Sequence, residues 1–89
     1  MKDLFDVFGG RDNLRLMCGA KDFQMGVGGD WACFDFDLYR VDFHVNPLPY
    51  YGMSIKEIGR GRVVFDGYYL TLEQTREAFE EYTGHSLSF

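Results

Sequence analysis

Apolar and polar residues alternate strictly between residues 31 and 45, and the phase of the alternation changes once. The apolar members are first even-numbered and then odd-numbered: Ala32, Phe34, Phe36 and Leu38, followed by Val41, Phe43 and Val45. A period of two places them on the covered face of a β-sheet. The change of phase requires a bulge or a turn, and we expect a turn because strands usually have about 3–10 residues. The segment therefore predicts an antiparallel hairpin with one open face.

Signals on both sides extend this hairpin into a meander. The turns are expected at residues 28–30 and 59–61, and the prolines at 47 and 49 interrupt the ladder because proline has no N–H. The additional strands are expected around Phe23, Met25 and Val27, around Tyr51, Met53 and Ile55, and around Val63, Val64 and Phe65. Together these segments predict a sheet of four to five strands.

Two helical segments are expected before the sheet. Leu4, Phe5 and Phe8 share one face of a short helix that Gly9 and Gly10 stop. A second helical turn is expected to begin at Asp12 as its N-cap and to end at Gly19. It would carry the apolar residues Leu14, Leu16 and Met17.

The C-terminal helix has the clearest signals in the chain. Thr71 and Gln74 form a capping-box pattern, and Gly84 is expected just beyond the last turn. The apolar face would consist of Leu72, Thr75, Ala78, Phe79 and Tyr82. This helix should cover one face of the sheet, so residues 1–89 form a single α+β domain.

Charge and composition narrow the classes of partner. The formal net charge is −5 and the isoelectric point is near 4.8, which opposes direct binding to duplex nucleic acid. It suits a partner with a basic surface, although ordinary solubility is the simpler explanation of such a charge. No apolar run is long enough for a leader or a membrane span, so a cytoplasmic protein is expected. Cys18 and Cys33 lack zinc-site spacing and are expected to be free thiols, with a single disulfide left open.

Two acidic surfaces are candidate partner-binding sites. The open face of the predicted hairpin carries Asp35, Asp37 and Asp42, with Trp31 beside them. The outer face of the C-terminal helix carries Glu73, Glu77, Glu80 and Glu81. Either set would face Lys and Arg residues of a partner, while the alternative for both is an ordinary solvated surface.

Exposed aromatic residues are the second kind of candidate. Trp31 and the tyrosine pairs at 50–51 and 68–69 would anchor a protein interface or stack on unpaired bases. The basic residues near the predicted 59–61 turn are Lys56, Arg60 and Arg62. Combined with the aromatics they would make a weak single-strand binder.

Catalysis, metals and cofactors are not indicated. His44 and His85 are the only histidines, and neither has a Ser or Cys at a recognisable spacing. The glycines at 26, 28 and 29 lack the Gly-Lys-Ser/Thr ending of a phosphate loop. We expect a non-enzyme without metal or cofactor, since an enzyme would have to assemble its pocket from residues far apart in the sequence.

The order of motifs resembles a family of small proteins of unknown function from tailed phages and their prophages. The shared frame is Gly9-Gly10, the segment Met17-Cys18-Gly19-Ala20-Lys21-Asp22-Phe23, residues 41–45 before Asn46-Pro47, and the ending Thr83-Gly84-His85-Ser86-Leu87. The chain departs from this frame in its shorter link near residues 37–40 and in lacking an acidic pair before the last helix. The resemblance implies a phage or prophage origin and no particular activity.

These observations predict a small acidic phage protein that binds and inhibits a host nucleic-acid-handling complex without catalysis. Phages carry many acidic inhibitors of this kind, anti-CRISPR proteins among them, so the setting is the cytoplasm of the bacterial host. The alternatives are an oligomeric accessory or structural phage protein and a single-stranded nucleic-acid binder. Binding through the acidic hairpin face would be abolished by reversing Asp35, Asp37 and Asp42 to Lys.

Overall fold

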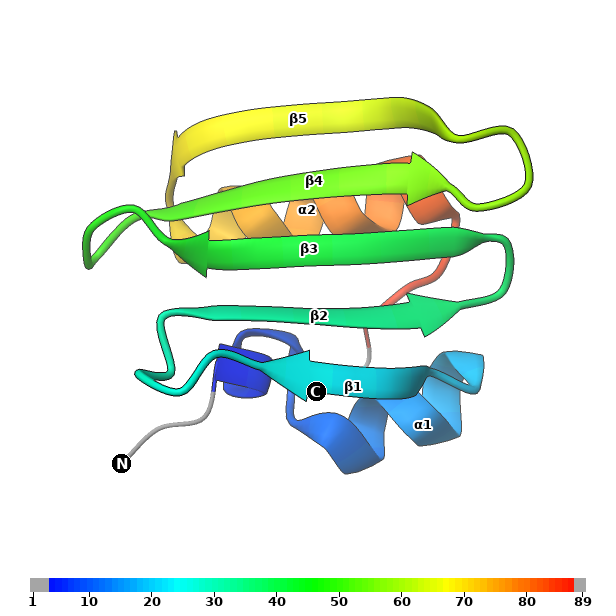
Figure 1. The fold of residues 1–89 in the computed structure, drawn as a ribbon, viewed down its shortest axis with the longest axis horizontal. Helices are drawn as coiled ribbons and strands as arrows, with labels where there is room; N and C mark the ends of the chain where they lie inside the picture. Colours follow the sequence, from blue (N-terminus) through cyan, green and yellow to red (C-terminus); the bar gives the residue numbers. More distant parts are fainter. Residues whose placement is uncertain (1–3, 88–89) are drawn as a thin grey trace.

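One antiparallel sheet forms the centre of the molecule. The computed structural model describes residues 4–87, apart from the side chains at positions 17 and 18. The strands are β1 (Lys21–Met25), β2 (Trp31–Phe36), β3 (Tyr39–Val45), β4 (Tyr51–Glu57) and β5 (Arg62–Leu70). They lie side by side in sequence order, each antiparallel to the next (Figure 1). The predicted meander and the α+β class are therefore confirmed.

The helical elements cover one face of this sheet. They are the 3₁₀-helix η1 (Leu4–Phe8), α1 (Arg11–Cys18) and α2 (Leu72–Thr83). Helix α2 is seen behind the sheet between β3 and β4 in Figure 1, and it contacts β4 and β5. The 3₁₀-helix η1 contacts both β2 and α2. Arg76 on α2 donates from Nε to the carbonyl oxygen of Val7 at 2.8 Å, which joins the two ends of the chain. Among the described residues, no helix or strand covers the opposite face.

Phenylalanine rings fill the space between the sheet and the helices. The fully buried ones come from all layers: Phe5, Phe8, Phe34, Phe36, Phe43 and Phe79. The Phe79 ring on α2 lies 5.1 Å from the Phe36 ring and 5.0 Å from the Phe8 ring. Edge-to-face and offset contacts at these distances add to the free energy of burial. One aromatic core therefore fixes η1 and α2 against the sheet.

Helix α2 begins and ends as its sequence predicts. The Thr71 hydroxyl accepts the Gln74 backbone N–H at 3.1 Å, and Gln74 Oε1 accepts the Thr71 N–H at 2.9 Å. Gly84 follows in the left-handed conformation, with φ 75°. Leu72 and Tyr82 sit at the margin of the helix–sheet interface and stay partly exposed, whereas Phe79 is at its centre.

The β2–β3 hairpin has the predicted turn, and it corrects two residue placements. Phe36 pairs with Tyr39, so the turn consists of Asp37 and Leu38. Leu38 was expected in the core but is 69% exposed, because a two-residue turn lifts it off the sheet. Asp37, with φ 49°, is likewise in the turn and not on the strand.

Helix α1 and the first strand also differ in detail from expectation. Gly10 occupies the N-cap position of α1, and Asp12 lies inside the first turn, 3.4 Å from Arg15. Leu16 is 88% exposed because the helix buries only a narrow face around Leu14. Strand β1 ends at Met25, which leaves Val27 in the following turn.

Candidate functional site: the open face of the sheet

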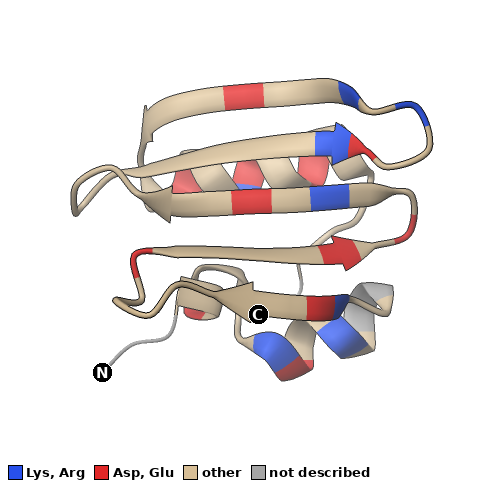
Figure 2. Ribbon diagram, viewed as in Figure 1, with Lys and Arg blue, Asp and Glu red and all other residues tan. Residues whose placement is uncertain are grey.

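The register of the strands arranges the open face into three rows that run across the sheet. The aromatic row consists of Gly26, Trp31, His44, Gly52 and Tyr68. The acidic row consists of Gln24, Cys33, Asp42, Ser54 and Asp66. The ion-pair row consists of Lys21, Asp35, Arg40, Lys56 and Val63. Chemistry thus changes from apolar to acidic to basic along the strands, and Figure 2 shows acidic positions midway along β3 and β5.

Two glycines allow the rings of the aromatic row to lie down on the sheet. A Cβ atom added to Gly26 would be 2.2 Å from Trp31 Nε1, and one added to Gly52 would be 2.3 Å from His44 Cε1. The space that a side chain would occupy at each glycine is therefore filled by a ring from the neighbouring strand. Trp31 leans toward β1 and His44 leans toward β4, so the two rings diverge.

The rings of this row remain accessible. Trp31 is 45% exposed and Tyr68 is 59% exposed. The Tyr68 ring lies 6.3 Å from the His44 ring at an angle of 59°. Large exposed aromatic side chains are enriched at the centres of protein interfaces. The aromatic row therefore has the character of a docking surface.

The acidic row places two exposed carboxylates next to these rings. Asp42 is two residues from His44 on β3, and Asp66 is two residues from Tyr68 on β5. Ser54 of β4 lies between the two aspartates, so they are separated by two strand spacings, or about 10 Å. At this separation they act as two distinct negative sites.

Cys33 completes the acidic row as an inert thiol. It is a free cysteine that is almost fully buried, and its Sγ lies 3.8 Å from Gln24 Oε1. Burial, assisted by the nearby Asp42 carboxylate, raises the pKa of the Cys33 thiol. A raised pKa keeps sulfur in the less nucleophilic thiol form. The side chain of Cys18 lies outside the described residues.

The ion-pair row corrects the predicted acidic stripe. Asp35 is only 8% exposed, and its two oxygens accept from Arg40 Nε at 2.6 Å and Nη2 at 3.0 Å. The hydrogen bonds from Arg40 hold the pKa of the Asp35 carboxyl below its usual range, against the opposing effect of burial. Asp37 in the turn lies 3.7 Å from His85 Nε2. Of the predicted stripe, only Asp42 stays exposed on the open face.

The acidic residues of α2 belong to a different surface. Glu73, Glu77 and Glu81 are exposed on the helix layer, behind the sheet in Figure 2. Glu80 is half-buried, and its Oε2 accepts the backbone N–H of Leu87 at 2.8 Å, so it holds the chain after the helix. The predicted partner-binding residues are thus distributed over two faces and do not form one continuous site.

The tyrosine pairs behave differently from each other. Tyr50 is exposed and Tyr51 half-buried, as alternation predicts. Tyr68 and Tyr69 are both exposed because Tyr69 has φ 55°, which interrupts the alternation at the end of β5. Asp66 and the glycines beneath the rings were not identified from the sequence. Their signal, a glycine opposite an aromatic residue, appears only once the register is known.

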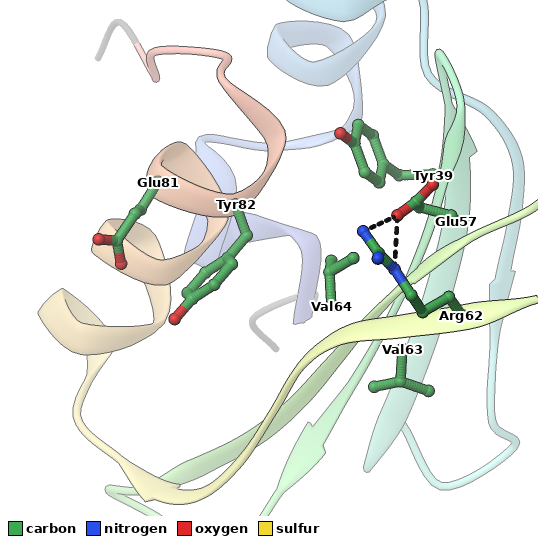
Figure 3. Close-up of a pocket in the computed structure, with 7 residues that line it drawn as sticks. All are labelled: Tyr39, Glu57, Arg62, Val63, Val64, Glu81 and Tyr82. Carbon is green, nitrogen blue, oxygen red and sulfur yellow. Dashed lines mark hydrogen bonds and ion pairs between the residues drawn. The ribbon is translucent and has the colours of Figure 1, made fainter.

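A shallow hollow lies on the helix side, between α2 and the β4–β5 end of the sheet (Figure 3). Its volume is about 540 Å³, and Tyr39, Val64 and Tyr82 line it. Arg62 donates to Glu57 Oε1 from Nε at 3.0 Å and from Nη2 at 2.7 Å, while Glu81 points away from this pair. The charged groups satisfy each other, so the hollow lacks the convergent polar groups of a catalytic pocket.

Within residues 4–87, no three His, Cys, Asp or Glu side chains come together as a metal site. None of the described helices is long and apolar enough to cross a membrane. No protein-family model, curated protein or solved structure matches the chain.

Proposed function

We propose that this chain is a non-catalytic, phage-borne protein that binds a basic surface of a host nucleic-acid-handling complex and blocks it, in the manner of an anti-CRISPR protein. The observation that carries the proposal is the open sheet face, where exposed aromatic rings stand beside the exposed carboxylates of Asp42 and Asp66. The net charge of −5 steers such a face toward basic partners. The resemblance to small phage proteins supplies the bacterial cytoplasm as the setting.

The size of the face supports a protein partner. Seen as in Figure 1, the molecule extends 31 × 25 Å between its outer Cα atoms. This corresponds to roughly 780 Å², close to the ~800 Å² that each partner contributes to a standard protein interface. A molecular face of this extent, with exposed aromatic side chains beside exposed carboxylates, is large enough for such an interface.

The test is affinity capture with charge-reversed variants. The tagged chain is incubated with a nuclease-treated lysate of a CRISPR-bearing bacterium at moderate salt, and retained proteins are identified by mass spectrometry. The test variant is Asp42→Lys with Asp66→Lys. The control is Glu73→Lys with Glu77→Lys, which changes the net charge equally on the other face. Reversal of Asp35 is avoided because its ion pair with Arg40 stabilises the hairpin.

We expect the wild-type chain and the α2 control to retain a nucleic-acid-handling complex that the open-face variant loses. The purified complex should then lose nucleic-acid binding when the wild-type chain is added. Equal retention by the open-face variant would refute the open face as the docking surface. Recovery of the bait alone would refute the inhibitor function.

The edge of β5 supports a second candidate function, an oligomeric accessory or structural protein. Among the described elements none pairs with the outer edge of this nine-residue strand, and Val63 and Tyr69 are 53% and 68% exposed. Uncovered strand edges pair readily with a second copy. Light scattering after gel filtration would show a dimer that Tyr69→Lys dissociates, and a wild-type monomer at all concentrations would contradict this function.

A further inference from the structure

We propose that the aromatic row and the acidic row together form a binding site for guanidinium groups, so that the face takes an arginine-rich segment of its partner. This inference rests on the proposed function and names the chemistry of the contact. Three features support it: the orientation of the rings, the positions of the carboxylates, and a negative net charge that opposes nucleic-acid ligands.

The exposed faces of the aromatic rings can stack against the flat face of a guanidinium group. Trp31 and His44 lie over Gly26 and Gly52, so one side of each ring is covered by backbone and the other faces solvent. The negative face of an aromatic ring attracts a cation, and a flat guanidinium stacks on it in a way that a compact ammonium does not. An upright ring would offer its edge, and an edge repels cations.

The carboxylates can accept hydrogen bonds from the edge of the same guanidinium group. Asp42 and Asp66 each stand two positions along a strand from a ring of the aromatic row, a distance of about 7 Å. A guanidinium carries its five N–H donors around the rim of the plane, so it can rest on a ring and donate sideways to a carboxylate. Each pair of one aromatic ring and one aspartate can thus bind the face and the edge of one arginine side chain.

The spacing indicates several arginines in place of one. Asp42 and Asp66 are separated by β4 and lie about 10 Å apart, which is too far for one guanidinium to pair with both. His44–Asp42 and Tyr68–Asp66 therefore make two neighbouring subsites. A segment whose arginines are two helical turns apart, about 10 Å, matches this pair.

Unpaired bases are the other planar groups that stack on exposed rings. They arrive with phosphates, and the phosphates would meet Asp42 and Asp66 on a chain whose net charge is −5. The electrostatic attraction that supports single-strand binding is therefore reversed at this half of the face. The basic residues of the sheet are grouped at its other end, toward the β4–β5 turn (Figure 2).

The test uses Trp31, the only tryptophan of the chain, as the reporter. A fluorescein-labelled arginine-rich decapeptide and its lysine counterpart of equal charge are titrated with the full chain, and anisotropy gives the affinities. Unlabelled peptides are titrated in parallel while the emission of Trp31 is recorded. The variants are Asp42→Asn with Asp66→Asn, and the control Glu73→Gln with Glu77→Gln, which removes two charges from the helix layer.

We expect the arginine peptide to change Trp31 emission and to bind about tenfold more weakly to the Asp42→Asn, Asp66→Asn variant, as the loss of two exposed charge pairs predicts. The α2 control should bind as the wild type does, and the lysine peptide should bind several-fold more weakly. Equal weakening in both variants or equal affinity for the two peptides would overturn the inference. A single-stranded oligonucleotide that binds the wild-type chain more tightly than the arginine peptide does would overturn it in favour of base stacking.

The peptide-binding assay and the capture assay test the arginine site and the proposed function separately. If the arginine peptide does not bind but Asp42→Lys with Asp66→Lys still abolishes capture of the host complex, the open face docks a basic surface by another chemistry. If the peptide binds and no host complex is captured, the site exists and the inhibitor function is wrong.

Discussion

Replacing Gly52 by alanine tests whether the His44 ring lies flat on the sheet. The new Cβ atom would be 2.3 Å from Cε1 and 2.5 Å from Nε2 of His44, so the ring must leave its position. Displacing a half-buried ring and forcing its side chain off its preferred rotamer costs about 0.5–1.5 kcal/mol, and crowding a packed site costs up to about 3 kcal/mol. We expect Gly52→Ala to lower the free energy of unfolding by about 1 kcal/mol.

The same substitution should have the opposite effect when His44 is absent. Gly52 is not among the residues with positive φ, so alanine fits its backbone. In a His44→Ala background, Gly52→Ala should therefore stabilise by about 0.5–1 kcal/mol, because glycine loses more conformational entropy on folding. The difference between the two backgrounds is a coupling energy of about 1–2 kcal/mol, within the range measured for side chains in contact.

The assay is urea denaturation of the four members of this cycle, supported by melting temperatures that should shift by roughly 4–8 °C per kcal/mol in a domain of this size. Gly59→Ala is the control, since a Cβ there would meet no atom within 4 Å and Gly59 is not among the glycines with positive φ. It should behave alike in both backgrounds. A Gly52→Ala effect of equal size and sign with and without His44 would show that the ring does not occupy the space above Gly52.

Three further predictions concern the frame that holds the open face. The pKa of Asp35 is lower in the folded protein than in the unfolded chain, so its pair with Arg40 stabilises the fold above the unfolded-state pKa, and this stability is lost as the pH falls through the folded-state pKa. Asp35→Asn should therefore lower the free energy of unfolding by about 1–2 kcal/mol at pH 7 and by less near pH 3, as urea denaturation at the two pH values would show. The expected loss is moderate because Arg40 is partly exposed to solvent. Thr71→Ala should reduce stability by about 1 kcal/mol through loss of the cap, whereas Thr71→Ser should be nearly neutral, as chemical denaturation would show. Phe79→Ala should destabilise by about 3–5 kcal/mol while Leu72→Ala on the same helix stays below about 1 kcal/mol, and similar calorimetric values for both would contradict the assigned core.

Most of the fold could be predicted because its signals are local. Alternation over residues 31–45 fixed the faces of β2 and β3, and the Thr71–Gln74 capping box fixed the start of α2. The wrong placements occurred where the end of a strand and the start of a turn have the same alternating sequence pattern. Leu38 continues the alternation of β2 in sequence, yet a two-residue turn begins one position earlier. Period alone does not distinguish the last residues of a strand from the first residues of a turn.

The candidate site was harder to predict because its parts meet across strands. Placing the turn at Asp37 and Leu38 makes Asp35 oppose Arg40, and this pairing removes Asp35 from the acidic surface. Asp66 joins Asp42 only through the register of two further strand pairs. The left-handed backbone conformation of Tyr69 changes which tyrosines are exposed, and no local sequence pattern predicts this conformation.

The arrangement of the open face also favours a foreign partner over a second copy of the same face. A two-fold dimer brings identical patches together, so open face against open face would place the Asp42 and Asp66 carboxylates of both copies close to one another. Burying like charges in this way opposes association, even though the exposed rings of Trp31 and Tyr68 would gain from it. A basic surface meets the same rings without this repulsion. Under the proposed function, the acidic row therefore selects the partner of the aromatic row by charge, and the edge of β5 is the surface proposed for self-association.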